Sequence, residues 1–235
     1  MVTLLREAFF FSRHHLQPLL LIALVYTLPS LVVELLFQGD KQALPEAMQL
    51  LLSGLFVCLG VVQFGAAMLY IHGRVQGAPI SVGNAIGGAI RQLMPLLLIN
   101  LLMGIAIAGG LLLLVLPGLY LAYKLLFAEF MLLFHQRSPI AALKESYRVT
   151  EGCATEILPP LGIWITAVIL LAMARMALFG DTGTADSIGL IVQEGLSMLL
   201  SIYGWALLYR LYQRYIADQI DAPARISQDE RPPEE

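Results

Sequence analysis

Six long apolar stretches, each close to the length of a bilayer-crossing helix, most constrain how this chain can fold. A helix needs about 20 predominantly apolar residues to cross the hydrocarbon core. Within lipid, only a helix satisfies its backbone hydrogen bonds inside one segment. The sequence therefore predicts an all-α integral membrane protein whose six transmembrane helices lie at residues 16–37, 48–71, 94–116, 118–134, 157–179 and 188–209.

The composition supports a membrane domain over residues 1–217. Of the 235 residues, 58% are hydrophobic and 13% are charged, and the mean hydropathy is +0.77. A soluble domain carries about 45–50% apolar and about 25% charged residues, so too few charges remain here to cover a water-facing surface. Residues 218–235 hold few apolar side chains, and we expect them to form a disordered cytoplasmic tail.

The distribution of Lys and Arg predicts the orientation. If the N-terminus is cytoplasmic, eleven basic residues lie inside and only Lys41 lies outside, which follows the positive-inside rule. Residues 16–37 are too long for the apolar region of a cleavable signal, so we expect them to remain as an anchor. The eleven inner residues are Arg6, Arg13, Arg74, Arg91, Arg137, Lys144, Arg148, Arg210, Arg214, Arg225 and Arg231.

The chain also repeats itself. Pro18-Leu-Leu-Leu-Ile-Ala-Leu in the first span matches Pro95-Leu-Leu-Leu-Ile-Asn-Leu in the third. His72-Gly-Arg74 with Pro79-Ile80 matches His135-Gln-Arg137 with Pro139-Ile140. These matches predict three repeated units, each a short cytoplasmic amphipathic helix followed by a hairpin of two spans, around an axis along the membrane normal. Leucine-rich composition alone could produce part of the match.

The cytoplasmic segments that precede the hairpins are residues 2–14, 80–93 and 138–152. In the third, Ser138 is expected to cap a helix and Pro139 to occupy its first position. Ile140, Leu143 and Tyr147 fall near one face, which predicts a helix lying in the membrane interface. The alternative is a stem that extends the next span into water.

Two prolines bear on the shape of the spans. Pro29 lies inside the first span and is expected to kink it. Pro117-Gly118 separates the third and fourth spans and predicts a tight antiparallel hairpin. The alternative, one long kinked helix, would hold about 40 apolar residues, far more than the roughly 20 that cross a bilayer.

Ionisable residues within the spans are the first candidates for function. A charge near the bilayer centre costs about 2.5–3.5 kcal/mol on insertion scales, so it usually faces the interior of the bundle. At a rise of about 1.5 Å per residue, Glu129 lies near the midplane of the bilayer. Lys124, Arg175 and Glu194 lie at a common level nearer the outer end of their spans. A polar pin, with Arg175 bound to Glu194 or Glu34, is one interpretation; a solute or proton pathway and snorkelling are the others. The candidate cluster is Lys124, Glu129, Arg175, Glu194 and Glu34.

No residue pattern specifies a reaction or a metal. The sequence has no His-Glu-x-x-His, no Gly-x-Ser-x-Gly and no glycine-rich phosphate loop. His15, His72 and His135 fall at inner span ends but lack acidic or cysteine companions. Cys58 and Cys153 lie at different depths, so a disulfide between them is not expected. We predict no enzymatic activity, no metal site and no cofactor.

One block of sequence resembles a known family. The residues Val115-Leu-Pro117-Gly118, followed by Ser138-Pro-Ile-Ala-Ala-Leu-Lys-Glu-Ser146-Tyr-Arg-Val-Thr150-Glu-Gly152, are similar to the shared core of the YciC-type bacterial inner-membrane proteins. The block is more distantly similar to the membrane domain attached to some glycerophosphodiester phosphodiesterases, whose hydrolase chemistry sits in a separate soluble domain. The resemblance implies a bacterial plasma membrane and no activity. Lys124 and Glu129 depart from the family pattern, so a role for them need not be shared.

These observations favour a non-enzymatic inner-membrane protein that associates with membrane lipids or other inner-membrane proteins and supports envelope organisation. Nucleic acid is not an expected partner, because the net charge is −3 and no basic patch is interleaved with aromatics. The alternative is a transporter or channel for a small solute or lipid that uses the outer-half charged cluster. A polar cavity reaching Glu129 would favour transport, and a packed interior would favour association.

Overall fold

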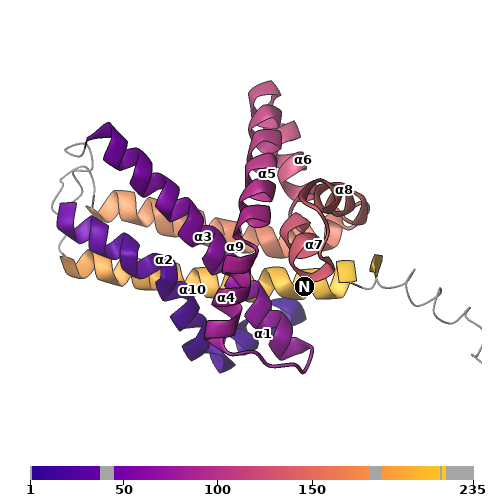
Figure 1. Ribbon diagram of the computed structural model, residues 1–235, viewed down its shortest axis with the longest axis horizontal. Coiled ribbons are helices and arrows are strands. Elements are labelled where there is room, and N and C mark those ends of the chain that lie inside the picture. Colours follow the sequence, from indigo (N-terminus) through magenta and orange to yellow (C-terminus); the bar gives the residue numbers. More distant parts are fainter. Residues whose placement is uncertain (1, 38–44, 180–186, 218, 221–235) are drawn as a thin grey trace, which may run out of the picture.

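The computed structural model describes residues 2–37, 45–179, 187–217 and 219–220. Over these ranges the chain is helical and contains no strand (Figure 1). Six segments are long and apolar enough to cross a membrane: Leu16–Leu36, Glu46–Val75, Leu93–Leu113, Val115–His135, Ala154–Ala174 and Ile191–Ala217. The predicted all-α class and the number of candidate spans are thus confirmed for this part of the chain. The predicted tail lies almost wholly outside it.

Four long helices pack together. They are α2 (Leu16–Phe37), α3 (Glu46–Val75), α9 (Ala154–Phe179) and α10 (Ser187–Tyr212), and α10 contacts the other three. A π-helical turn, η2 (Gln213–Ala217), continues α10. Small side chains such as Ala66 in α3 and Ala206 in α10 are fully buried, because small residues let helix backbones approach closely in lipid.

The helices α5 (Leu93–Leu113) and α6 (Val115–Lys124) form a tight hairpin. The chain reverses at Leu114, whose backbone is extended at φ −167° and ψ 154°. The two helices then approach so closely that a Cβ added at Gly110 would lie 2.8 Å from the Cα of Gly118. The chain therefore turns back as the sequence predicts, and the single kinked helix does not form.

The position of this turn differs from the prediction. Pro117 and Gly118 do not form the turn but lie in the first helical turn of α6. Proline suits that place because the first residues of a helix need no amide donor. Gly118 is required there because a Cβ would meet the backbone nitrogen of Leu111 at 2.8 Å.

The α5–α6 hairpin projects away from the four packed helices (Figure 1). The side chains at its tip are widely exposed, with Leu112 at 89% and Leu116 at 79%. Only 17% of the apolar window in α5 is buried within the protein, compared with 44% in residues 115–135. The many exposed apolar side chains of this hairpin are suited to contact with lipid.

Each predicted cytoplasmic segment contains a helix: α1 (Val2–His14), α4 (Val82–Arg91) and α8 (Pro139–Val149). The helix α7 (Ala128–His135) precedes α8. Between α8 and α9, Gly152 has a positive φ of 82°, a conformation that ends a helix. The alternative of a stem continuous with the next span is therefore wrong for residues 139–149.

One detail of α8 corrects the prediction, and a second was not predicted. Ser138 occupies the N-cap position, but its side chain makes no capping hydrogen bond; in α4, Ser81 does accept one from the Asn84 amide over 3.2 Å. The buried face of α8 consists of Ala142, Ser146 and Val149, whereas Ile140 and Tyr147 are exposed. The small residues, and not the large apolar ones, face the protein because they allow α8 to lie close against its neighbours.

Candidate functional site

The fourth span is interrupted where it meets α8. The chain forms a turn at residues 125–127, between α6 and α7. A turn inside a span frees backbone groups that a continuous helix would bond, and lipid offers them no partner. Such a break is tolerated only where protein or water satisfies the freed groups.

Side chains of α8 satisfy the groups that this break frees. The Ser146 hydroxyl donates to the carbonyl oxygen of Lys124 over 2.9 Å and accepts from the amide of Phe127 over 3.2 Å. The Thr150 hydroxyl lies 3.3 Å from the same Lys124 carbonyl oxygen. It also lies 2.8 Å from the carbonyl oxygen of Ser146 in its own helix. Both residues are fully buried. The sequence block Ser146 to Thr150 therefore completes the fourth span.

Side chains of α6 in turn satisfy the C-terminal end of α8. The Lys124 ammonium donates to the carbonyl of Tyr147 over 3.3 Å, and the Tyr123 hydroxyl donates to the carbonyl of Thr150. Lys124 is only 4% exposed, and its nitrogen lies 4.8 Å from the ring centre of Tyr147 and 5.7 Å from that of Tyr120. A cation is stabilised both at a helix C-terminus and over an aromatic face. The two helices thus cap each other.

Lys124 does not meet an acidic partner in this arrangement. Within the described residues, no carboxylate oxygen lies within 4.0 Å of its nitrogen. Its charge is stabilised by the α8 terminus and two tyrosine rings. Lys124 therefore has a structural role that the sequence alone did not indicate.

Glu129 has a partner that the sequence did not indicate. Asn100 in α5 donates through Nδ2 to Glu129 Oε1 over 2.5 Å and to the carbonyl of Leu96 over 2.9 Å. Glu129 is half-buried at the start of α7. Asn100 could have been singled out, because it is an uncommon polar residue in an otherwise apolar span.

The remaining candidate residues are only partly described. Glu34 in α2 and Glu194 in α10 are half-buried and take part in interactions. Arg175 belongs to α9, but its side chain lies outside the described part of the structure. The pairing of Arg175 with Glu194 therefore stays a prediction.

Two of the histidines bind tyrosines of α10. His72 Nδ1 lies 3.0 Å from the Tyr209 hydroxyl, and His135 Nε2 lies 2.7 Å from the Tyr212 hydroxyl. His72 also stacks on Phe134, with ring centres 4.1 Å apart. The described residues contain no group of three His, Cys, Asp or Glu that could hold a metal. These equivalent positions of the predicted repeat thus meet in one aromatic cluster.

Two groups outside the spans have shifted pKa values. Burial lowers the pKa of His15 from its ordinary value of 6.5, and the neighbouring charges of His14 and Arg74 add to the effect. The hydrogen bond with Tyr120 raises the pKa of the exposed Tyr147 hydroxyl from its ordinary value. Neither shift creates a pair of groups poised for acid–base chemistry.

Comparisons with known proteins identify the family. The profile of an uncharacterised protein family, UPF0259, matches residues 46–214, which is more than half of the chain. The chain belongs to the UPF0259 family. A UPF0259 membrane protein of Pectobacterium carotovorum is 29% identical over 180 residues, covering 73% of this chain and 70% of that protein.

Two further UPF0259 membrane proteins show how far the likeness extends. One from Serratia proteamaculans is 27% identical and covers 89% of this chain and 96% of its own length. One from Photorhabdus laumondii is 28% identical over 68% of this chain. No solved structure matches the chain. The UPF0259 match includes the interrupted span, α8 and the aromatic cluster, but assigns no activity to them.

Proposed function

We propose that this UPF0259 protein is a non-enzymatic, multi-pass protein of the bacterial inner membrane, with both termini cytoplasmic. It acts by associating with membrane lipids and other inner-membrane proteins and so supports envelope organisation. The YciC-type resemblance and the three repeated units form part of this proposal. Its relatives are membrane proteins of Gram-negative bacteria, which fits the location.

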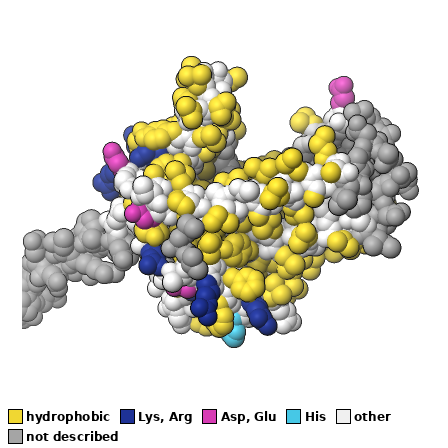
Figure 2. All heavy atoms as spheres, turned by 180° about the vertical axis from the view of Figure 1, so that it is seen from behind, with side chains coloured by type: hydrophobic (Ala, Val, Ile, Leu, Met, Phe, Trp, Pro, Cys, Tyr) yellow, Lys and Arg dark blue, Asp and Glu magenta, His cyan; other side chains and the backbone are white. Residues whose placement is uncertain are grey.

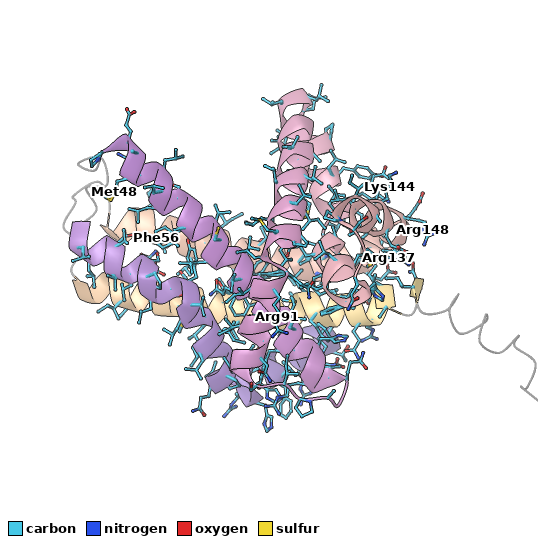
Figure 3. The ribbon with its side chains drawn as sticks, viewed as in Figure 1. Met48, Phe56, Arg91, Arg137, Lys144 and Arg148 are labelled. Carbon is cyan, nitrogen blue, oxygen red and sulfur yellow. The ribbon has the colours of Figure 1, made fainter. Side chains whose placement is uncertain are left out.

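The arrangement of charge supports the orientation. On the face shown in Figure 2, Lys and Arg lie over the left and lower parts of the molecule, and the described surface farther to the right is largely apolar. Arg91, Arg137, Lys144 and Arg148 lie on α4, α8 and the segment before α8, far from Met48 in α3 (Figure 3). A single basic end is what the positive-inside rule requires of a cytoplasmic face.

The observation that carries the proposal is the way polar groups within the spans are used. Lys124 caps α8 from a position only 4% exposed, and the carbonyl and amide freed beside it bind Ser146. Packed aromatic rings, among them Phe130 and Tyr212 with centres 4.9 Å apart, fill the neighbouring space. These polar groups bind other groups of the protein and hold its helices together. This arrangement supports a role in association more than the passage of a solute.

A transporter remains the second candidate, and Glu129 is the residue that favours it. Its carboxylate is half-buried, and within the described residues only Oε1 receives a hydrogen bond. An intramembrane carboxylate with an available oxygen can bind a cation or proton. Glu129→Gln would remove that capacity while keeping a partner for Asn100.

The deciding experiment is quantitative identification of the lipids and proteins that copurify from native membranes. The proposal expects at least one lipid class or membrane protein to be enriched over the bulk membrane, equally for the parent and Glu129→Gln. If the copurifying lipids and proteins matched the bulk membrane, and liposomes showed a solute flux that depends on Glu129, the association proposal would be overturned in favour of transport. Alkaline phosphatase fused after Ala222 should be inactive and after Asp181 active; the reverse would reject the orientation.

A further inference from the structure

A pocket opens between α1 and the junction of α10 with η2, at the basic end of the molecule. Its volume is about 190 Å³, many times the roughly 10–15 Å³ needed to admit one water. The pocket therefore has room for a small polar group but not for a whole lipid. Its lining consists of Leu4, Glu7, Arg210, Gln213 and Arg214.

The two arginines are available for an anion. Arg210 lies with its guanidinium carbon 5.7 Å from the ring centre of Phe11 and donates from Nη1 to Gln213 Oε1 over 3.3 Å. These contacts hold the guanidinium in place and leave most of its five N–H donors unused. Within the described residues, no carboxylate oxygen lies within 4.0 Å of Arg210 or Arg214. A pre-oriented guanidinium with unused donors suits phosphate binding.

The helix that forms the other wall of the pocket is suited to the membrane surface. Leu4, Ala8 and Ser12 are buried in one stripe of α1, which packs against α10. On its outer side, Phe9 is 60% and Phe10 is 72% exposed. Exposed aromatic side chains beside basic residues are typical of a helix at the boundary between headgroups and acyl chains. The pocket therefore lies where phospholipid phosphates are found.

We propose that this pocket binds the phosphate of an anionic phospholipid headgroup from the cytoplasmic leaflet. Arg210 and Arg214 bind the phosphate oxygens, and Gln213 keeps Arg210 in position. The acyl chains lie along the exposed face of α1 at Phe9 and Phe10. A soluble phosphate has no apolar group that could contact that face. This inference rests on the proposed lipid association and orientation, and it adds the lipid class and the site.

The test uses purified full-length protein in detergent, titrated with phosphatidylglycerol, with thermal unfolding as the readout. About 1 M salt screens diffuse surface attraction, because the Debye length is then about 3 Å. The variant Arg210→Gln/Arg214→Gln should need at least about tenfold more lipid for half-maximal stabilisation. A tenfold change corresponds to about 1.4 kcal/mol, which is close to the lower end for a single hydrogen bond to a charged group. The control Arg6→Gln/Arg13→Gln removes the same charge from exposed positions outside the pocket and should behave like the parent.

A second variant does not depend on the arginine variant remaining folded. Glu7→Gln removes the carboxylate that lines the pocket and is exposed, so it should lower the half-maximal lipid concentration. Equal responses of the pocket and control variants, or no effect of Glu7→Gln, would overturn the proposal. Stabilisation by inorganic phosphate alone would assign the pocket to a soluble anion. Enrichment of only zwitterionic lipid in native membranes would reject this site and leave the general association intact.

Discussion

The hydroxyl of Ser146 in α8 donates to the carbonyl oxygen of Lys124 in α6 over 2.9 Å. This contact joins a short helix to the point where a membrane span is interrupted. The same hydroxyl accepts from the amide of Phe127, so one side chain satisfies both the carbonyl and the amide that the turn frees. The integrity of the fourth span thus depends on a residue outside it.

Ser146→Ala should therefore destabilise the protein by about 1–3 kcal/mol, the cost of leaving a buried polar group without a partner. Thermal unfolding in detergent would measure the loss. Ser138→Ala is the matched control, because Ser138 is exposed and makes no capping bond at the start of the same helix. Equal stabilities of the two variants would show that the break is satisfied in another way.

The close approach within the α5–α6 hairpin gives a second prediction. Gly110→Ala places a Cβ 2.8 Å from the Cα of Gly118, and overpacking of this kind costs about 1–3 kcal/mol. Gly109→Ala, one residue earlier, meets nothing within 4 Å and should be neutral or stabilising. The unfolding temperatures of the two variants test this prediction. A Gly110→Ala variant as stable as Gly109→Ala would contradict the observed packing.

The exposure of α8 predicts a labelling pattern. After Cys58 and Cys153 are replaced by serine, single cysteines at Lys144 and Arg148 should react with a membrane-impermeant maleimide from the cytoplasmic side, because both positions are exposed. A cysteine at Ala142, which is fully buried, should be protected. Protection of both exposed positions would place this side of α8 within the hydrocarbon core or against another protein.

His15 predicts a stability that falls on acidification. Its folded pKa is lowered by burial and by His14 and Arg74, so the folded state binds fewer protons than the unfolded state just below pH 6.5. The contribution of His15 to stability is complete above its ordinary pKa of 6.5 and declines as the pH falls toward its lower pKa in the folded state. His15→Gln should flatten the decline between pH 7 and pH 5, and Arg13→Gln should retain it. An unchanged slope in His15→Gln would assign the acid sensitivity to other groups.

The predicted pairing of Arg175 with Glu194 can be tested by a double-mutant cycle. Removing one partner by Arg175→Leu or Glu194→Leu should destabilise more than removing both, because the remaining charge is left uncompensated in a low-dielectric site. Thermal stability in detergent gives the coupling. Strictly additive losses would exclude a direct contact and make Glu34 the preferred partner of Arg175.

The spans were predictable because hydrophobicity acts locally, whereas the site depended on contacts distant in sequence. The limits of α2 match the predicted 16–37, since lipid imposes the length of an apolar helix whatever surrounds it. Lys124 was expected among intramembrane charges at the outer half of the spans, but it caps α8. Nothing near Lys124 in the sequence indicates Tyr147, 23 residues later.

The protein-facing side of α8 was not predictable, for a related reason. The sequence placed Ile140, Leu143 and Tyr147 near one face of a helix in the membrane interface. It did not indicate that Ala142 and Ser146 face the protein. In water a helix buries its large apolar side chains, but in a membrane protein those side chains can face lipid while small residues make the protein contacts. The pairing of Asn100 with Glu129 likewise required the fold to be known.

The reciprocal capping of α6 and α8 sets an order for assembly during synthesis. The chain emerges from its N-terminus, so the carbonyl of Lys124 exists before Ser146, which follows 22 residues later. Until that serine has emerged and α8 has folded back, the turn in the fourth span has no protein partner for its freed groups. The fourth span therefore reaches its final hydrogen bonding only after residue 146 has been synthesised and α8 has packed against the turn.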